Sequence, residues 1–309
     1  MNVLSLFDGI SAGQVAFQRA GIPVTKYYAS EIDKFAIQVT QNNFPNTIQL
    51  GDVTKWREWG IDWSSIDILI AGSPCQGFSR AGNRLNFEDP RSKLFFEFVN
   101  ILNHIGKFNP DVLFLLENVN MDKEWKYLIN DLIGVSYVCI NSSLVSAQLR
   151  DRLYWTNINK GFIPLPDDKK ILLKDIIEHG FVDRDKSYCI DANYWKGVPS
   201  IEHYKKKSVR QIVYKKPHGG NKGGLQERDK FHALRIATNG NYIILDTNTW
   251  RKLTPVECER LQNFNDNYTE GISNTQRYKA LGNSWTVDVI AHIFSFITNP
   301  VEEQLFIEY

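Results

Sequence analysis

The chain has few cysteines, and their spacing excludes two kinds of small-domain architecture. There are four in 309 residues, at positions 75, 139, 189 and 258, and no two of them form a C-x-x-C pair. Zinc sites and disulfide frameworks both need cysteines in close, regular spacing. We therefore predict a protein without a metal or disulfides, which suits a reducing compartment.

The sequence also lacks a long apolar run and a basic N-terminal leader. No stretch is long enough to cross a bilayer, and residues 1–7 show neither a charged leader nor a cleavage site. Hydrophobic residues make up 43% and charged residues 23%, which is ordinary for a globular protein. We expect a cytoplasmic protein without membrane contact, large enough for two domains or one large one.

What the sequence does contain is an alternation of short apolar runs with helix-like segments. Residues 2–7, 25–30, 67–71 and 111–116 are predicted strands, separated by segments with helical spacing of apolar residues. This alternation predicts an α/β fold with a Rossmann-like, doubly wound parallel sheet. The first strand ends in a turn of small residues, as in nucleotide-binding folds, but the turn lacks their G-x-G-x-x-G fingerprint.

A cysteine follows one of the predicted strands directly. The run from Asp67 to Ala71 breaks into Gly72-Ser73-Pro74, and Cys75 comes next. Open α/β sheets bind their ligands in loops at this carboxyl edge, so Cys75 is a candidate nucleophile. A lone cysteine is more often a buried, inert residue.

Further motifs decide between these two interpretations. Ser73-Pro-Cys75-Gln-Gly-Phe-Ser79 resembles the catalytic Pro-Cys loop of the cytosine-5 DNA methyltransferases. Other segments resemble motifs of that family in its order and spacing, and the resemblance covers about residues 1–157 and 250–298. These segments are Phe7-Asp-Gly-Ile-Ser-Ala-Gly13, Glu31, Gly51-Asp52, Glu117-Asn118-Val119, Gln148-Leu-Arg150-Asp-Arg152 and Gly282-Asn-Ser284.

The resemblance implies a pocket for S-adenosylmethionine as cofactor. Glu31 lies about twenty residues beyond the first loop, where an acid can accept both hydroxyls of a ribose. Taken singly, Ser11 is equally a helix cap, and Glu31 or Asp52 is more often a surface charge or a cap. The residues expected to bind the cofactor are Phe7, Asp8, Gly9, Ser11, Glu31, Ile32, Asp52, Val53, Pro74, Asn283, Ser284 and Trp285.

The catalytic residues that the resemblance implies are Cys75, Glu117, Arg150 and Arg152. Glu117 directly follows a run of apolar residues, where an acid is rarely found without a partner or a function. Arg150 and Arg152 are two apart, so in an extended segment they point the same way and suit a pyrimidine oxygen or a phosphate. A structural ion pair is the alternative for either arginine.

Charge is unevenly distributed along the chain. Residues 196–252 contain 13 Lys or Arg against 4 Asp or Glu, a net +9, while the rest of the chain carries −8. Such a block suits a polyanion such as duplex DNA; a solvated surface insertion is the alternative. The candidate DNA-binding residues are Gln76, Ser79, Arg80, Lys205, Lys206, Lys207, Arg210, Lys222 and Arg228.

These patterns predict a division into three parts. Residues 1–160 form the catalytic and cofactor-binding domain, and residues 161–249 form a small, irregular, strand-rich target-recognition domain. Residues 250–309 return to complete the catalytic domain. There, Thr254-Pro-Val-Glu257 predicts a capped helix start. An apolar helical stripe from Val287 to Ile297 should pack back on the first half and bring Asn283 and Ser284 to the cofactor.

Two rival functions remain beside a DNA methyltransferase. One is an RNA cytosine methyltransferase on the same scaffold, similar to the family's tRNA-modifying branch; the other is a non-catalytic DNA-binding regulator. Leu94–Phe98 and Leu281–Trp285 resemble the de novo DNA methyltransferase branch. Without a chromatin-reading domain, a free-standing enzyme of bacterial or viral origin is expected. It would be a monomer, with a cognate restriction endonuclease as candidate partner.

Overall fold

The computed structural model describes residues 1–73, 90–198, 200, 204, 210–214, 225–227, 242–244 and 250–300. The chain divides into two compact units. Unit 1 comprises Met1–Asn141, Asp151–Pro166 and Val287–Tyr309, and unit 2 comprises Ser142–Arg150 and Asp167–Thr286. This division differs from the predicted domain boundaries, because residues 250–286 belong with the middle of the chain. The DNA-reading role of residues 161–249 stays a prediction.

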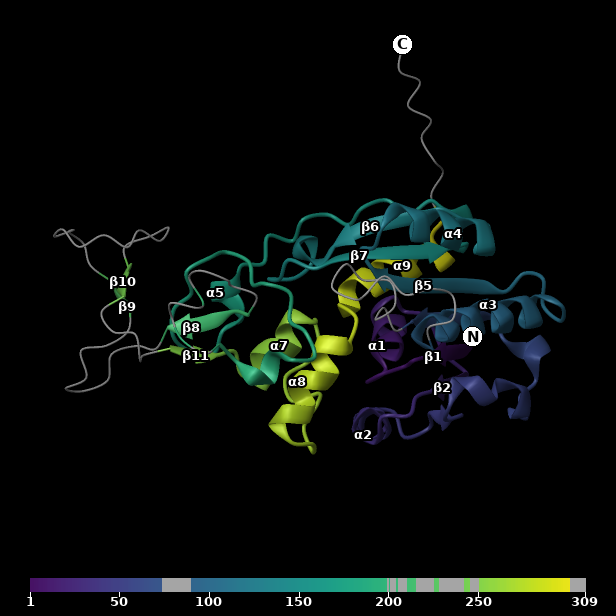
Figure 1. Cartoon of the computed structure of the whole chain (residues 1–309), viewed down its shortest axis with the longest axis horizontal. Coiled ribbons are helices and arrows are strands. Elements are labelled where there is room, and N and C mark those ends of the chain that lie inside the picture. The colour runs from purple at the N-terminus through teal and green to yellow at the C-terminus, as the bar shows by residue number, and fades with distance from the viewer. Residues whose placement is uncertain are drawn as a thin grey trace, which may run out of the picture. The chain divides into compact units, whose positions relative to one another are not determined.

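Unit 1 is built on one seven-stranded sheet (Figure 1). The strand order is β3-β2-β1-β4-β5-β7-β6. The first five pair in parallel, whereas β7 is antiparallel to both of its neighbours. The strands are β1 (Asn2–Leu6), β2 (Lys26–Ser30), β3 (Ile48–Gln49), β4 (Ile68–Gly72), β5 (Leu113–Val119), β6 (Tyr137–Asn141) and β7 (Asp151–Thr156). The predicted α/β fold with a doubly wound sheet is thereby confirmed.

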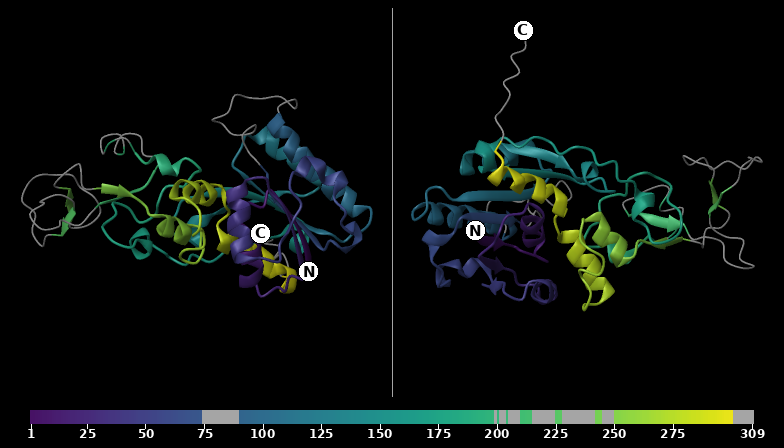
Figure 2. Two further views of the ribbon diagram at one scale, coloured as in Figure 1. Left: turned by 90° about the horizontal axis from the view of Figure 1, so that it is seen from below. Right: turned by 180° about the vertical axis from the view of Figure 1, so that it is seen from behind.

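Helices cover both faces of this sheet, which explains why its central strands are apolar throughout. One face contributes Leu4, Leu69 and Leu116 to a core that includes Phe95 and Phe98 of α3 (Pro90–Gly106). Figure 2 shows α1 (Ala12–Arg19) and α9 (Val287–Thr298) on the other side of the sheet. Unit 1 also contains α2 (Lys34–Asn43) and α4 (Lys123–Ile133).

The first and last helices of unit 1 pack against each other. The rings of Phe17 on α1 and Phe294 on α9 stack with centroids 4.1 Å apart, and both side chains are fully buried. Arg19 and Asp288 form an ion pair beside them. The prediction that the C-terminal apolar helix packs back on the first half of the chain is confirmed.

Unit 2 is irregular and contains two small antiparallel pairs of strands. Strand β8 (Ile212–Tyr214) pairs with β11 (Trp250–Lys252), and β9 (Leu225–Glu227) pairs with β10 (Tyr242–Ile244). The described helices of unit 2 include α5 (Leu173–Ile176), α7 (Pro255–Leu261) and α8 (Asn274–Asn283).

Helix α7 begins as the sequence predicts. The Thr254 hydroxyl accepts a hydrogen bond from the Glu257 amide, and the Glu257 carboxylate accepts one from the Thr254 amide at 2.8 Å. The same carboxylate, which is fully buried, forms an ion pair of 2.7 Å with Arg251. Glu257 therefore fixes the helix start and anchors β11 at once.

Gly282 allows close packing within unit 2, and its replacement by alanine should be costly. A Cβ at this position would lie 2.1 Å from the carbonyl carbon of Asp191, and backbone cannot move aside as a flexible side chain can. We expect Gly282→Ala to lower the free energy of unfolding by about 2–3 kcal/mol, the scale of overpacking, as measured by urea denaturation. Gly106→Ala, at a helical glycine with open space around it, should have little effect.

Candidate active site

The loop after β1 has an unusual backbone. Phe7, Gly9 and Ser11 all have positive φ, at 56°, 60° and 58°. Left-handed geometry costs little for glycine but is strained for a bulky residue such as phenylalanine, and such strain clusters at functional sites. Hydrogen bonds hold the loop in this form: the Asp8 amide donates to the Ser30 carbonyl, and the Ser11 amide donates to the Asp8 carbonyl.

Glu31 ties the end of β2 to this loop. One carboxylate oxygen accepts a hydrogen bond from the Gly9 amide at 2.8 Å, and the other accepts from the amides of Ile32 and Asp33 at 2.7 and 2.8 Å. The neighbouring Ile32 side chain is 76% exposed, which is unusual for isoleucine. An oriented acid therefore lies beside an uncovered apolar surface.

The remaining predicted cofactor residues of unit 1 come from the same edge of the sheet. Asp52 follows β3 and caps η1 (Val53–Glu58), where its carboxylate accepts from the amide and hydroxyl of Thr54, each at 2.9 Å. Val53 is buried. Because β1, β2 and β3 are adjacent and parallel, Phe7, Glu31 and Asp52 lie along one edge. Their role in cofactor binding stays a prediction.

Asp8 differs from its neighbours because its side chain is turned into the protein. Its carboxyl group accepts hydrogen bonds from the hydroxyls of Ser5, Ser11 and Tyr27. Burial of this carboxyl raises the pKa of Asp8 to about 6, and the nearby Glu31 carboxylate adds to the rise, while the three hydroxyls oppose it. Nothing in the sequence pattern distinguishes this half-buried, hydrogen-bonded acid from a surface one.

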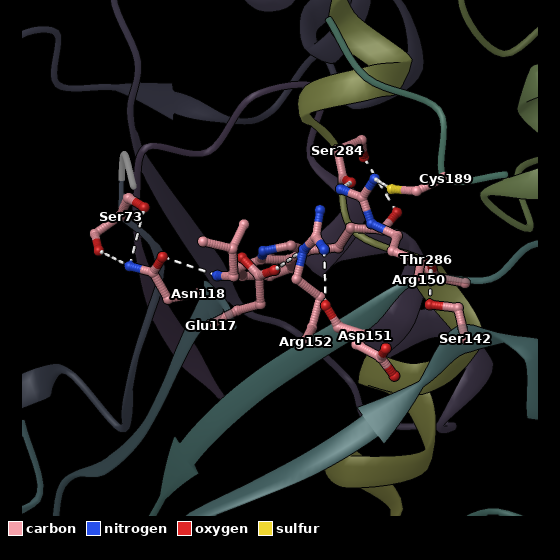
Figure 3. Close-up of polar contacts among 12 residues, drawn as sticks. Ser73, Glu117, Asn118, Ser142, Arg150, Asp151, Arg152, Cys189, Ser284 and Thr286 are labelled. Carbon is pink, nitrogen blue, oxygen red and sulfur yellow. Dashed lines mark hydrogen bonds and ion pairs between the residues drawn. The ribbon is translucent and has the colours of Figure 1, made fainter. Parts of the chain in front are cut away.

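Glu117 and Arg152 meet at the end of β5 (Figure 3). The Arg152 Nε lies 2.9 Å from a Glu117 carboxylate oxygen, and both side chains are largely buried. In the register between β5 and β7, Arg152 lies opposite Val119, which is two residues beyond Glu117. Arg152 and Glu117 are therefore diagonal neighbours on the same face of the sheet. The structure therefore brings these two predicted catalytic residues together.

The chain leading to the predicted nucleophile begins beside this pair. Gly72 is the register partner of Glu117. The side-chain amide of the buried Asn118 donates a hydrogen bond to the Ser73 hydroxyl at 2.9 Å. Asn118 therefore fixes the residue immediately before Pro74 (Figure 3). The predicted site residues Pro74, Cys75, Gln76, Ser79 and Arg80 themselves lie outside the described residues.

Arg150 is held by contacts with the backbone of unit 2. It lies in unit 2 and is only 4% exposed, and its guanidinium donates to the carbonyls of Ile190 and Ser284 at 3.0 and 2.8 Å. It also contacts the Cys189 sulfur at 3.2 Å. These contacts fix the Arg150 side chain within unit 2 (Figure 3), and its catalytic role stays a prediction.

A buried polar network extends this arrangement to the segment after α8. Gln262 donates to the carbonyls of Leu281 and Ser284 and accepts from Gln148 and Thr286. Asn283 is exposed, whereas Ser284 is buried. No sequence pattern indicates Gln262, because its partners are side chains and carbonyls that lie at least 19 residues away. Binding of the cofactor by Asn283, Ser284 and Trp285 stays a prediction.

Of the predicted DNA-binding residues, the structure describes Arg210. Its guanidinium donates to the Gly197 carbonyl at 3.0 Å and lies 3.9 Å from the Asp191 carboxylate. Lys205, Lys206, Lys207, Lys222 and Arg228 lie outside the described residues. Within the described ranges no group of three or more His, Cys, Asp or Glu could hold a metal ion. No helix there is long and apolar enough to cross a membrane.

Solved structures share this α/β fold. The Entamoeba histolytica methyltransferase EhMeth matches with a TM-score of 0.69 at 18% identity, covering 98% of this chain and 99% of that one. The Schizosaccharomyces pombe Dnmt2 methyltransferase matches with a TM-score of 0.64 at 18% identity, covering 97% and 99%.

Sequence comparison then identifies the family. Residues 1–299 match the C-5 cytosine-specific DNA methylase family. The Type II methyltransferase M1.ScrFI of Lactococcus lactis subsp. cremoris is 32% identical, over 97% of this chain and 79% of that protein. M.NgoBI of Neisseria gonorrhoeae is 32% identical over 93% and 90%, and M.HhaI of Haemophilus parahaemolyticus is 29% identical over 95% and 93%. The chain belongs to this family and is a DNA cytosine-5 methyltransferase.

Proposed function

We propose that this enzyme methylates carbon 5 of cytosine at a specific short sequence in duplex DNA, using S-adenosylmethionine and a covalent adduct with Cys75. The observation that carries the proposal is the Glu117–Arg152 pair at the carboxyl end of β5, beside Ser73. A carboxyl and a guanidinium together match the polar edge of cytosine, and the chain leaves Ser73 directly for Pro74 and Cys75.

The first chemical step is assigned to Cys75. Carbon 5 of cytosine is a poor nucleophile, but attack of the Cys75 thiolate on carbon 6 forms a carbon–sulfur bond and moves the ring's electrons toward carbon 5 and the ring nitrogen. Glu117 engages that nitrogen and the exocyclic amine, and so stabilises the charge that develops there. Arg152 binds the carbonyl oxygen of the ring and holds Glu117 in place.

The second step restores both the ring and the thiolate. After carbon 5 has gained its methyl group, loss of the carbon-5 proton to a base returns an electron pair to the ring and breaks the bond between carbon 6 and sulfur. No described side chain is assigned as this base, and water serves. Because the ring is inaccessible inside a duplex, the cytosine has to be flipped out of the helix.

The residues at the edge of β1 to β3 fit S-adenosylmethionine. Glu31 would hold the ribose, because three backbone amides orient its carboxylate and Oε2, which accepts one of them, retains a lone pair for a hydroxyl. The exposed Ile32 offers an apolar surface for a planar base, and Asp52 an acceptor for its amine. Bound there, S-adenosylmethionine supplies an electrophilic methyl group.

Replacing Glu31 by alanine should weaken cofactor binding. We expect a loss of about 1–3 kcal/mol in the binding free energy of S-adenosylmethionine, the scale of hydrogen bonds to a charged group, measured by isothermal titration calorimetry. Asp62→Ala is the control. Asp62 is exposed and caps η2 (Trp63–Ser65), which precedes β4 at the amino ends of the parallel strands. An unchanged dissociation constant for Glu31→Ala would show that Glu31 does not bind S-adenosylmethionine.

The substrate is tested by offering the enzyme duplex DNA and tRNA with a radiolabelled methyl donor. We expect incorporation into DNA alone, and sequencing of methylated cytosines at single-base resolution should reveal one short site. Incorporation into tRNA alone would show that the substrate is tRNA and not duplex DNA. The Type II relatives support a companion endonuclease, whose cleavage this methylation would block.

A further inference from the structure

We propose that Asp8 is a positioning residue, whose carboxyl group holds the loop from Phe7 to Ser11 and thereby orients Glu31 for the methyl donor. This inference rests on the proposed function and deepens it. It assigns no direct contact between the Asp8 carboxyl and the cofactor, although the sequence suggested Asp8 as a cofactor-binding residue.

The first support is the set of groups that surround the carboxyl. Its oxygens accept from the Ser5 hydroxyl at 2.6 Å, the Tyr27 hydroxyl at 2.7 Å and the Ser11 hydroxyl. These donors come from β1, β2 and the start of α1, so one carboxyl joins three elements. All three donor residues are buried.

A second layer of hydroxyls supports the first. The Ser11 hydroxyl accepts hydrogen bonds from the side-chain amide of Gln14 and from the Thr40 hydroxyl, each at 3.2 Å. The same Gln14 side chain also donates to the Thr47 hydroxyl. The Thr40 hydroxyl lies 3.3 Å from the Gly9 carbonyl. The network therefore reaches from Asp8 to α2 and back to the backbone of the loop.

The third support is the link from the loop to Glu31. The Gly9 amide donates to Glu31 at 2.8 Å, and Gly9 lies between Asp8 and the left-handed Ser11. A left-handed serine has to be held by surrounding contacts, and its side chain is bound to Asp8. If that bond is lost, Ser11 is free to relax and Gly9 loses its position against Glu31.

The charged form of the Asp8 carboxyl destabilises the folded protein. Glu31 is a second carboxylate nearby, and among the described ion pairs no cation is paired with either acid. The titratable groups that face the Asp8 carboxyl are Tyr27 on β2 and Glu31 after it. A charged group retained where burial disfavours it is typical of a functional site rather than of a stabilising one.

The pKa of Asp8 also determines how the stability of the fold changes with pH. It is about 6 in the folded protein, against 3.8 in a free side chain. Between about pH 4 and 6 the unfolded chain has released this proton while the folded chain keeps it. Stability contributed by Asp8 therefore falls as the pH rises through this window, and stays low above it. An asparagine, which is neutral, should show no such fall.

The test compares Asp8→Asn with the wild type and with Asp62→Asn, which makes the same charge change at an exposed site. At pH 8 we expect Asp8→Asn to raise both the dissociation constant and the KM for S-adenosylmethionine about tenfold, with kcat within twofold. Its melting temperature should equal or exceed that of the wild type. Hydrogen exchange at the Gly9 amide should be faster. Ser11→Ala should change affinity and exchange in the same direction.

Three results would overturn the inference. These are unchanged cofactor affinity in Asp8→Asn, unchanged exchange at Gly9, or a lower melting temperature with cofactor and DNA affinity lost together, since the last marks a purely structural residue. Failure of the proposed function looks different, because the wild type itself would then not bind S-adenosylmethionine. The exchange rate at Gly9 would still decide whether Asp8 holds the loop.

Discussion

Cys75→Ala is expected to abolish methyl transfer while leaving the binding of S-adenosylmethionine and DNA largely intact. The substitution removes the sulfur that adds to carbon 6, and without that bond carbon 5 has no means of attacking an electrophilic methyl group. Little volume is lost, so the fold should be unaffected. Transfer of radiolabelled methyl groups to duplex DNA, together with binding titrations, measures both parts of the expectation.

The chain provides matched controls at its other cysteines. Cys139 is exposed on β6, and partial desolvation of its thiol together with the nearby Asp151 carboxylate raises the pKa of that thiol, so it is a poor nucleophile. Cys139→Ala should retain full activity. DNA containing 5-fluorocytosine should trap the adduct on the wild type, because fluorine cannot leave as the proton does. Turnover by Cys75→Ala, or trapping on that variant, contradicts the covalent mechanism.

Glu117→Gln is expected to lower kcat at least about a hundredfold, equivalent to about 2.7 kcal/mol in the barrier. Glutamine keeps the shape of the side chain and can still accept the hydrogen bond from Arg152, but it has no carboxyl group to exchange a proton with the ring nitrogen. Affinity for DNA and for the cofactor should change far less. Single-turnover kinetics with saturating DNA isolates the chemical step.

This substitution also breaks a largely buried ion pair, so a loss of stability has to be separated from a loss of catalysis. Glu257→Gln makes the same change in the Glu257–Arg251 pair of unit 2. It should lower the melting temperature while the folded enzyme keeps a normal kcat. Equal kcat values in the two variants would reduce Glu117 to a structural acid at a strand end.

The sheet could be predicted because its strands carry strong local signals. The run from Val112 to Leu116 is apolar without interruption, and the structure buries all of it except the half-buried Leu113, with residues 113–116 in β5. Parallel strands then place Ser73 and Glu117 at one edge, which follows from topology alone. The capping box at Thr254 is another local signal, and for that reason its prediction also held.

The features that could not be predicted depend on contacts between distant residues. Arg150 and Arg152 have equivalent places in the sequence pattern. Yet Arg152 is paired with Glu117 while Arg150 is enclosed by carbonyls of residues 190 and 284. The inward turn of Asp8 likewise depends on Tyr27, which is 19 residues away. No periodicity records such a partner, so both arrangements require coordinates.

The pairing of α1 with α9 has a consequence for synthesis of the protein. Arg19 and its partner Asp288 are 269 residues apart in sequence. At roughly 5–20 residues per second, a ribosome needs about 15–50 s to translate that interval. During this time Phe17 lacks the ring that stacks on it in the finished protein. Until α9 is synthesised, the apolar face of α1 therefore stays uncovered and offers a binding site for a chaperone.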